Sequence, residues 1–394
     1  MPQPPFPIHP VSPAIDVVLT DSPFEQGLQQ GRGFADRIGA AGDVVKRLEA
    51  FDLLRPGWMP RVVFAWLARR KAYRGLREVL PVAAPAQWER LRGIAEGSGV
   101  PLDHVCLLNA LEPVLSDLTN SVTHGLNAGC SAIAVGADRT TARGPVVAHN
   151  FDYLPIIQPF YVLRDERPAE GLRSLVFSVA PLAGVVDGIN EAGLAVSYNY
   201  AYATDGGEPA VPLSMRLQEM LARCRNVGAA VAFLTSQPRW GGGLLMLADA
   251  EGAIVSLELT HRHHAVREGR PNAILTHSNR FCCGPTTEHE IDAEAVYGSN
   301  SPAALRSQPV HRSSNRRNAR LRELTEAAAS LDLPGIATLM SDHGPDNAAS
   351  ADTICMHSSY WHTTATLQLL PAERRMRVAY APTCAAKYVD FTIE

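Results

Sequence analysis

The stretch that decides the fold reads Asn127-Ala128-Gly129-Cys130-Ser131-Ala132-Ile133-Ala134-Val135, with Asn150-Phe151-Asp152-Tyr153 following soon after it. Small residues form a turn that leads into the cysteine, and the cysteine opens an apolar run typical of a buried strand. This arrangement suits a chain that cuts itself between Gly129 and Cys130. The cysteine would then become a new N-terminus, with its thiol as nucleophile and its freed α-amine as base.

The chemistry of such a site follows from ordinary acidities. A thiol is nucleophilic as the thiolate, and a free cysteine has a pKa of roughly 8.5. An α-amine, with a pKa of roughly 7.7–8.0, can take the thiol proton near neutral pH. Glycine at position 129 permits a strained peptide at the point of cleavage. The alternative for Cys130, taken alone, is a structural cysteine at the start of a strand.

The composition is that of an ordinary globular protein. The chain has 394 residues, 46% of them apolar and 19% charged, with a net charge of −4. This charge gives no reason to expect a nucleic-acid or anionic-membrane partner. The sequence contains no apolar run of transmembrane length and no N-terminal signal pattern, so we expect a cytoplasmic protein. Its seven scattered cysteines form no CxxC pair, which argues against a disulfide framework or a zinc ribbon.

The order of expected elements predicts the fold class. Helices are expected at 22–50, where Ser22-Pro23-Phe24-Glu25 has the form of a capping box, and at 58–80, 85–96 and 101–116. Strands and hairpins follow at 131–135, 145–149, 175–179, 185–199 and 244–259. Further helices are expected at 212–224, 226–236 and 315–330, and strands at 365–392. This order favours an α+β fold in which two antiparallel sheets are packed between helix layers, with a helical N-terminal segment.

The motifs, taken in order, resemble one known family. They are Phe24-Glu25-Gln26-Gly27, Leu91-Arg92-Gly93-Ile94-Ala95-Glu96-Gly97, Leu108-Asn109-Ala110-Leu111-Glu112 and Gly129-Cys130-Ser131. The set resembles the isopenicillin N acyltransferase-like family (the acyl-CoA:6-aminopenicillanic acid acyltransferase family) of self-processing N-terminal-nucleophile (Ntn) hydrolases. The resemblance implies a four-layer αββα sandwich.

The resemblance also implies roles for individual residues. Asp152 matches the carboxylate that orients the new α-amine, although by itself it reads as a turn aspartate. Asn199 matches a polar residue near the reacting centre. Asn279, in Thr276-His277-Ser278-Asn279, matches the residue whose side-chain N–H helps to form the oxyanion hole. Ser131 is expected to line the site beside Cys130.

A helix start and a later landmark complete the match. Ser313-Ser314-Asn315-Arg316-Arg317 resembles the Ser-x-x-Arg start of a helix in the family and implies that Ser314 and Arg317 reach the site. Arg316 is the alternative in register, and a solvated basic helix face is the simpler reading. Asp342-His343 and Ile354-Cys355-Met356-His357 resemble a structural landmark. Met356 stands where relatives often have arginine, which puts a charged substrate contact there in doubt.

Together these features predict an autoprocessing cysteine hydrolase or acyltransferase. Residues 1–129 would be a helical segment that stays bound after cleavage, and residues 130–394 the catalytic segment. The expected substrate is a small N-acyl compound with an amide or acyl-thioester bond, so coenzyme A would enter as a thioester substrate and no cofactor or metal is expected. A coenzyme A-dependent N-acyltransferase of natural-product biosynthesis is the alternative. The oligomeric state is left open.

Two alternatives belong to other classes. A metal-dependent hydrolase could use His261-Arg262-His263-His264 with His277 and His343, although a solvated loop is the simpler reading of the first group. A binding protein could have kept the fold and lost the chemistry, but the presence of Cys130, Asp152 and Asn279 argues against such a loss. The vicinal pair Cys282-Cys283 suggests packing more than redox chemistry.

Overall fold

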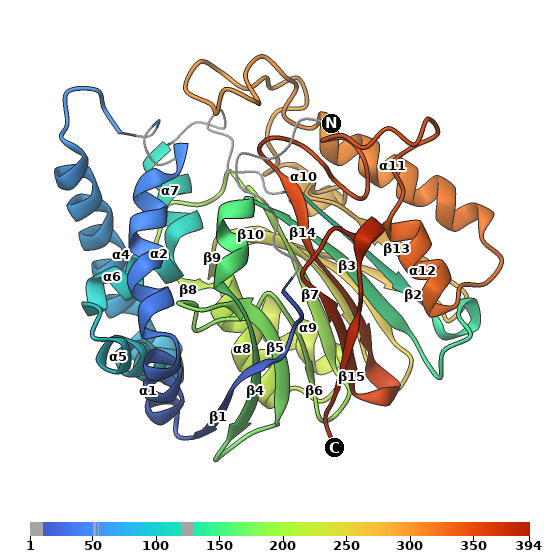
Figure 1. The fold of residues 1–394 in the computed structure, drawn as a ribbon, viewed down its shortest axis with the longest axis horizontal. Helices are drawn as coiled ribbons and strands as arrows, with labels where there is room; N and C mark the ends of the chain where they lie inside the picture. The colour runs from blue at the N-terminus through green and yellow to red at the C-terminus, as the bar shows by residue number, and fades with distance from the viewer. Residues whose placement is uncertain (1–10, 50–52, 54, 120–128) are drawn as a thin grey trace.

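Two stacked sheets with helices on both outer faces form the body of the protein (Figure 1). The computed structural model describes residues 11–49, 53, 55–119 and 129–394. One apolar cluster fills the space between the sheets, and others pack helices against each outer face. The predicted αββα sandwich is therefore confirmed.

The larger sheet has eight strands in the order β1-β4-β5-β6-β7-β10-β11-β12, and the smaller has six in the order β13-β2-β3-β14-β15-β16. The strands of the larger sheet are β1 (Ile15–Asp21), β4 (Tyr161–Pro168), β5 (Ser174–Val179), β6 (Asp187–Asn190), β7 (Ala195–Ala201), β10 (Gly242–Ala248), β11 (Ile254–Leu259) and β12 (His264–Gly269). Those of the smaller are β2 (Gly129–Val135), β3 (Val146–Tyr153), β13 (Ile274–His277), β14 (His362–Leu370), β15 (Arg375–Ala379) and β16 (Val389–Thr392). A short parallel pair, β8 (Val211–Pro212) and β9 (Arg239–Trp240), lies apart.

The helices form three groups. The helices of the first group precede β2 in the sequence and are α1 (Pro23–Gly33), α2 (Ala35–Arg47), α4 (Arg61–Ala83), α5 (Pro85–Ser98), α6 (Leu102–Asn109) and α7 (Leu111–Thr119). The helices α8 (Leu213–Arg223) and α9 (Val227–Thr235) pack on the larger sheet. The helices α11 (Arg312–Ala327) and α12 (Leu333–Met340) pack on the smaller, and α10 (Gly284–Thr287) is a single turn.

The glycine-containing motifs of the N-terminal segment bring α1 and α5 into backbone contact. A Cβ atom on Gly93 would lie 2.1 Å from the carbonyl oxygen of Phe24, and one on Gly27 would lie 2.2 Å from that of Arg90. Any larger residue would push the helices apart, because real Cβ atoms do not approach so closely. These glycines therefore serve the close packing of α1 against α5, which does not involve the reacting centre.

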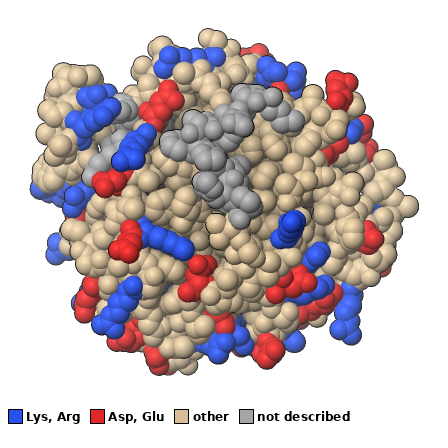
Figure 2. Space-filling view, viewed as in Figure 1, with Lys and Arg blue, Asp and Glu red and all other residues tan. Residues whose placement is uncertain are grey.

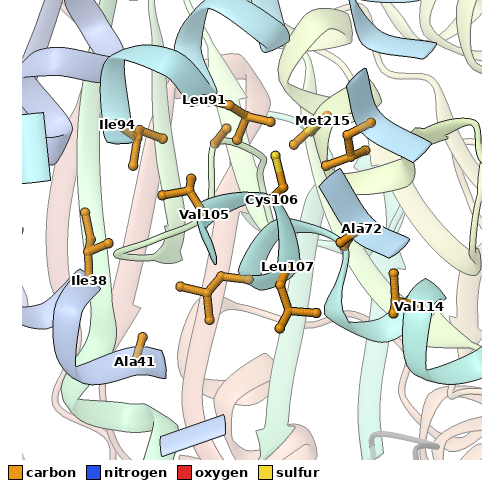
Figure 3. Close-up of a cluster of buried hydrophobic side chains, with 14 of the residues drawn as sticks. Ile38, Ala41, Ala72, Leu91, Ile94, Val105, Cys106, Leu107, Val114 and Met215 are labelled. Atoms are coloured by element: carbon orange, nitrogen blue, oxygen red, sulfur yellow. The ribbon is translucent and has the colours of Figure 1, made fainter. Parts of the chain in front are cut away.

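The N-terminal helices are fastened to the rest of the chain by apolar and ionic contacts. Their core includes Met215 from α8 as well as Ile38, Leu91 and Val105 (Figure 3). Arg90 in α5 forms two hydrogen bonds of 2.9 Å to the Glu166 carboxylate in β4. Both side chains are buried, and Arg164 Nε also lies 2.9 Å from Glu166 Oε1, so removing Glu166 would leave two buried guanidinium groups without this partner.

Three details of the N-terminal segment differ from the sequence predictions. The segment is not wholly helical, because β1 joins the larger sheet parallel to β4, which also makes that sheet not purely antiparallel. The first helix is broken at Phe34, and the predicted 101–116 helix is broken at Ala110; both residues leave helical geometry. The start of the first helix is confirmed, since the Ser22 side chain accepts the Glu25 N–H at 3.3 Å. The predicted turn before Gly129 lies within residues 120–128, which are outside the described residues, as is Ala50.

Charges of both signs are interspersed on the face shown in Figure 2. Within the ranges that the structure describes, no helix combines the length and the apolar character needed to cross a bilayer.

Candidate active site

Cys130 is buried at the beginning of β2, beside the central strand β3. Its register partner is Phe151, and the neighbouring pair is Gly129 with Asp152. Antiparallel pairing therefore brings the two sequence motifs of the site side by side, since β2 and β3 are consecutive strands. The thiol sulfur lies 3.9 Å from the backbone carbonyl oxygen of Asp152.

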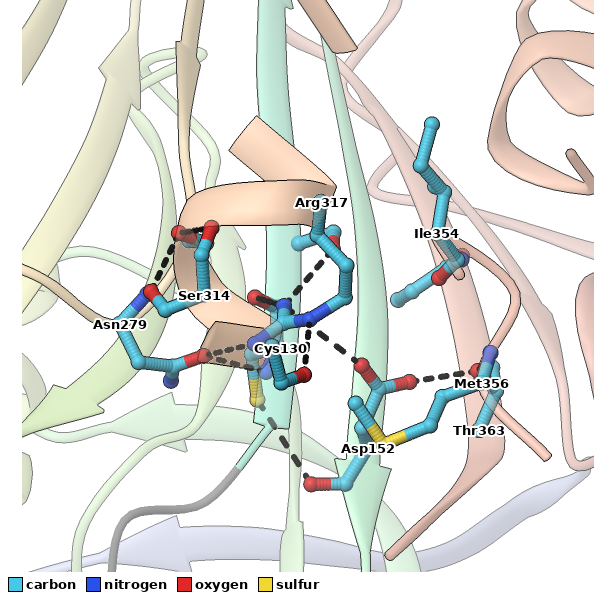
Figure 4. Close-up of polar contacts among 12 residues, drawn as sticks. Cys130, Asp152, Asn279, Ser314, Arg317, Ile354, Met356 and Thr363 are labelled. Atoms are coloured by element: carbon cyan, nitrogen blue, oxygen red, sulfur yellow. Dashed lines mark hydrogen bonds and ion pairs between the residues drawn. The ribbon is translucent and has the colours of Figure 1, made fainter. Parts of the chain in front are cut away.

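Two polar side chains, those of Asn279 and Arg317, hold the Cys130 backbone (Figure 4). The Cys130 N–H donates to Asn279 Oδ1 at 2.7 Å. The Arg317 guanidinium donates to the Cys130 carbonyl oxygen, to Ser131 Oγ at 3.0 Å and to Asn279 Oδ1 at 2.9 Å. The backbone groups on both sides of the Cys130 Cα are thus held by side chains from distant parts of the sequence.

The contacts of Asn279 differ from the role that the resemblance implies. Its Oδ1 accepts two hydrogen bonds, and its Nδ2 donates to the Tyr200 carbonyl oxygen at 2.9 Å. The side chain therefore presents an acceptor, not an N–H donor, to Cys130. In the uncut chain Asn279 holds the nitrogen that cleavage would turn into the α-amine.

The structure distinguishes the two candidate arginines. Arg317 is buried, whereas Arg316 is exposed and pairs with Asp352 at 2.7 Å. Ser314 and Arg317, three residues apart on α11, share the inward face of the helix. Ser314 Oγ accepts the Asn279 backbone N–H at 3.0 Å and so fixes that residue.

Asp152 is a fully buried carboxylate beside Cys130. Thr363 donates to its Oδ1 at 2.5 Å, while Oδ2 lies 4.0 Å from Arg317 Nη1 and makes no hydrogen bond. Burial raises the pKa of Asp152 to about 7, although Arg317 and Thr363 act in the opposite direction. An acceptor oxygen is therefore available near the point where a new ammonium group would form.

Asn199 supports the site indirectly, through the backbone next to Asn279. Its Nδ2 donates to the Ser278 carbonyl oxygen at 3.0 Å, and Ser278 Oγ lies 2.6 Å from Ser314 Oγ. These bonds order the segment that carries Asn279. No hydrogen bond between Asn199 and Cys130 is found among the described residues.

The sequence reading missed an ion pair next to the thiol. His149 Nδ1 lies 2.9 and 2.8 Å from the two carboxylate oxygens of Asp187, which belongs to β6 of the other sheet. Since Cys130 is paired with Phe151, His149 is its diagonal neighbour on the same face of the smaller sheet. The His149 Nε2 atom is buried without a hydrogen-bond partner of ordinary geometry.

This pair changes the proton affinities around Cys130. Burial alone would lower the pKa of His149, but the charge and hydrogen bonds of Asp187 outweigh it and raise the pKa to about 10. Burial raises the pKa of the Cys130 thiol, and the His149 ring opposes that rise. An imidazolium next to the sulfur stabilises the thiolate.

An apolar cavity of about 140 Å³ opens beside Cys130. Residues from both sides of Gly129 in the sequence line this cavity. They include Val45, Leu108, Leu111, Glu112, Phe151, Tyr153, Phe160, Val186 and Tyr198. Glu112 is the one acid in the lining, and burial raises its pKa to about 7 against the hydrogen bond from Tyr153. The cavity therefore suits an uncharged, apolar group.

Met356 packs against Gly129. A Cβ atom on Gly129 would lie 2.5 Å from the Met356 Cε. The Met356 backbone N–H donates to Thr363 Oγ1 at 2.7 Å, and Thr363 in turn donates to Asp152. The Met356 side chain therefore makes an apolar contact with Gly129, where an arginine would place a charge.

The histidines proposed for a metal-dependent hydrolase do not form one site. His261 is buried, but Arg262, His263 and His264 are exposed, as predicted for a solvated loop, and His263 stacks on His289 at 4.2 Å. His277 is buried against Ser256, and His343 belongs to a separate cluster. The backbone N–H groups of Cys282 and Cys283 both donate to Glu258, consistent with a packing role.

Comparison with known proteins identifies the family. The model of the family described as acyl-coenzyme A:6-aminopenicillanic acid acyl-transferase matches residues 139–382, a span that contains Asp152, Asn279 and Arg317 and begins after Cys130. No curated protein matches the chain.

Three solved structures are distantly similar. One is an N-acylethanolamine-hydrolyzing acid amidase ortholog of Caenorhabditis elegans, with a TM-score of 0.41 and 14% identity, covering 62% of this chain and 93% of that one. Penicillin V acylase of Agrobacterium tumefaciens has a TM-score of 0.40 and 16% identity, covering 67% and 86%. A mutant of the conjugated bile acid hydrolase of Clostridium perfringens has a TM-score of 0.37 and 12% identity, covering 67% and 97%.

These TM-scores are low, so the sandwich is assigned from the sheets of this chain itself. The family model covers more than half of the sequence and describes an acyl-transferase family. The chain belongs to the acyl-coenzyme A:6-aminopenicillanic acid acyl-transferase family.

Proposed function

We propose that the protein cuts itself between Gly129 and Cys130 and then hydrolyses the amide bond of a small N-acyl compound through a Cys130 acyl-enzyme. One observation carries the proposal: the Cys130 nitrogen is held by Asn279 Oδ1 at 2.7 Å, beside the buried Asp152 and at the wall of an apolar cavity. A structural cysteine at the start of a strand would need none of these groups.

Self-cleavage needs a thiolate before any α-amine exists. In the proposed step, the Cys130 thiol gives its proton to solvent, and the His149 imidazolium, which Asp187 keeps protonated, stabilises the thiolate. The sulfur attacks the Gly129 carbonyl carbon, the C–N bond breaks, and the Cys130 nitrogen takes up a proton. Water then hydrolyses the thioester, which releases the Gly129 carboxylate, the thiol and the α-amine.

Turnover repeats this chemistry on a substrate. The new α-amine takes the thiol proton, with its position fixed by Asn279 Oδ1 and by the unbonded Oδ2 of Asp152. The thiolate attacks the substrate carbonyl, and the leaving amine takes a proton from the α-ammonium. Water then hydrolyses the acyl-thioester. Asn279 Nδ2 carries two N–H groups, so the one that is not bonded to the Tyr200 oxygen would serve the oxyanion.

The cavity supports an acyl group as its occupant. Its aliphatic and aromatic wall would bury an alkyl or aryl chain and place the carbonyl carbon at the Cys130 sulfur. Because Leu108, Leu111 and Glu112 belong to the N-terminal segment, the proposed enzyme needs that segment after cleavage. Hydrolysis is favoured over transfer because the described cavity wall presents no cluster of basic side chains for the phosphates of coenzyme A.

Intact-protein mass spectrometry tests the processing step. Purified wild type should appear as two chains that separate between Gly129 and Cys130, whereas Cys130→Ala should stay whole. Cys224→Ala, which removes a buried thiol elsewhere, is the matched control and should be cut. A wild type that stays uncut under these conditions contradicts the proposal.

A substrate screen tests the second step. N-acyl amines with acyl chains of increasing length should release free acid, and an acyl-coenzyme A with an amine acceptor should give a new amide if transfer is the reaction. Cys130→Ala provides the blank. Acid release that is equal in wild type and Cys130→Ala would exclude Cys130 as the nucleophile.

A further inference from the structure

Four metal-binding side chains meet behind the site described above. His343 follows α12, Cys355 and His357 precede β14, and Cys384 lies between β15 and β16. One ligand atom from each lies within 4.8 Å of those of the other three. None of the four belongs to the acyl-transfer groups around Cys130.

The spacing of these atoms is that of a tetrahedral metal site. His357 Nε2 lies 3.4 Å from Cys355 Sγ and 3.5 Å from Cys384 Sγ. Zinc binds thiolate at about 2.3 Å and imidazole at about 2.0–2.1 Å, so tetrahedral zinc holds a sulfur and a nitrogen about 3.5 Å apart. We propose that His343, Cys355, His357 and Cys384 bind one zinc ion as a structural His₂Cys₂ site.

Hydrogen bonding alone leaves this cluster unsatisfied. His357 Nε2 can donate or accept one hydrogen bond, yet two sulfur atoms approach it. His343 Nε2 is buried and has no hydrogen-bond partner. A metal ion would satisfy all four groups at once. Cys355 and His357 share one loop, and Cys384 reaches His357 from a segment 27 residues further along the sequence.

Two other clusters with metal-binding side chains are less suitable. The Asp205 carboxylate, near His263 and His289, already accepts the Thr260 hydroxyl and two backbone N–H groups. The Glu258 carboxylate, near Cys282 and Cys283, accepts two backbone N–H groups and the Thr286 hydroxyl. Each has three potential ligands with its acid engaged, whereas the His₂Cys₂ cluster has four and no carboxylate.

The position of the proposed zinc suggests what it would stabilise. Met356, between the ligands Cys355 and His357, contacts Gly129, and its backbone N–H binds the same Thr363 that donates to Asp152. With four protein ligands the ion would have no open position for substrate or water, which is typical of a structural site. It would therefore fix the loop behind Asp152 and leave the chemistry to Cys130.

Metal analysis of the full-length protein tests the site. Protein expressed with added zinc and purified under reducing conditions without chelator should contain about one zinc per chain by plasma mass spectrometry. The double variant Cys355→Ser/Cys384→Ser should contain less than a tenth as much. Cys282→Ser/Cys283→Ser, which alters the thiols beside Glu258, is the matched control and should keep the wild-type content.

Wild-type protein gives a second measurement that does not depend on a variant folding. Metal-free protein titrated with cobalt(II) should show the intense absorption of tetrahedral cobalt thiolate, and zinc should abolish it. Absence of zinc together with no cobalt spectrum would overturn the proposal. Equal zinc in the wild type and the Cys355/Cys384 double variant, or a disulfide between these two cysteines in protein purified without reductant and with its native metal content, would also overturn it.

Discussion

The side-chain oxygen of Asn279 accepts the backbone N–H of Cys130 at 2.7 Å, while the amide nitrogen of the same side chain donates to Tyr200. The residue therefore holds the nitrogen that the proposed cleavage would turn into the α-amine. In the proposed reaction the acceptor oxygen would serve cleavage, and the N–H₂ group would serve the oxyanion in turnover.

Two substitutions of Asn279 separate these roles. Asn279→Asp keeps an acceptor oxygen and should still be cut, whereas Asn279→Leu should be cut about fivefold more slowly, since a lost hydrogen bond is worth about 1 kcal/mol. Time courses by mass spectrometry measure this difference. In cut Asn279→Asp, kcat should fall by about 10²–10³ because an oxyanion donor is missing. Equal cleavage rates in both variants would disprove the acceptor role.

His149 and Asp187 should matter most before the α-amine exists. His149→Gln and Asp187→Asn should slow self-cleavage at neutral pH by about 10²-fold, because the thiolate loses the imidazolium that stabilises it. The rate should recover partly at high pH, where hydroxide can remove the thiol proton. His277→Gln is the matched control because it changes another buried histidine of the smaller sheet. Unchanged cleavage in both dyad variants would exclude the proposed stabilisation of the thiolate.

Asp152 should make the uncut protein less stable as the pH rises. Burial raises its pKa to about 7, above the ordinary value near 4, so between these values the folded state keeps a proton that the unfolded chain releases. In the uncut Cys130→Ala protein, stability should therefore fall between about pH 4 and pH 7. Adding Asp152→Asn should remove this dependence and raise the melting temperature at pH 8 but not at pH 4. A melting temperature lowered by Asp152→Asn at pH 8 would contradict this sign.

Glu166 should be required to keep the two segments together. Glu166→Gln leaves the Arg90 guanidinium without its charged partner in a buried position, which should destabilise uncut Cys130→Ala protein by about 3–5 kcal/mol. Denaturant unfolding measures this loss, and size-exclusion chromatography of the cut enzyme detects release of the N-terminal segment. Glu89→Gln, which removes an exposed partner of Arg92, should cost less than about 1 kcal/mol. Similar losses in the two variants would show that the buried pair is not essential.

Much of the architecture could be predicted from local patterns. Ser22 and Pro23 indicate a helix start by capping chemistry, and the hairpin turns lie between apolar runs, so these predictions depend on neighbouring residues alone. Strand β4 was missed because its sequence contains Arg164-Asp165-Glu166, which resembles a solvated loop. Its charges can be buried because Arg90, from a distant helix, compensates Glu166.

Site residues could be predicted from the sequence only where they belong to a recognisable motif. The choice of Arg317 over Arg316 could have come from helical periodicity, since Ser314, Arg317 and Leu321 lie on one buried stripe. His149 gave one clue, a titratable residue at the end of the apolar run Val146-Val147-Ala148. Its partner Asp187 lies on the other sheet, and no local pattern in the sequence specifies which strands of two sheets face one another.

The first strand of the chain gives the proposed cut a further consequence. β1 pairs with β4 at the edge of the larger sheet, so after cleavage it would be a strand donated by one polypeptide to the sheet of another. If the N-terminal segment were lost, the backbone N–H and C=O groups of β4 would become an unprotected edge, open to pairing with a second molecule. The bound N-terminal segment would therefore protect the β4 edge against aggregation. A preparation from which this segment has been removed should precipitate as well as lose activity.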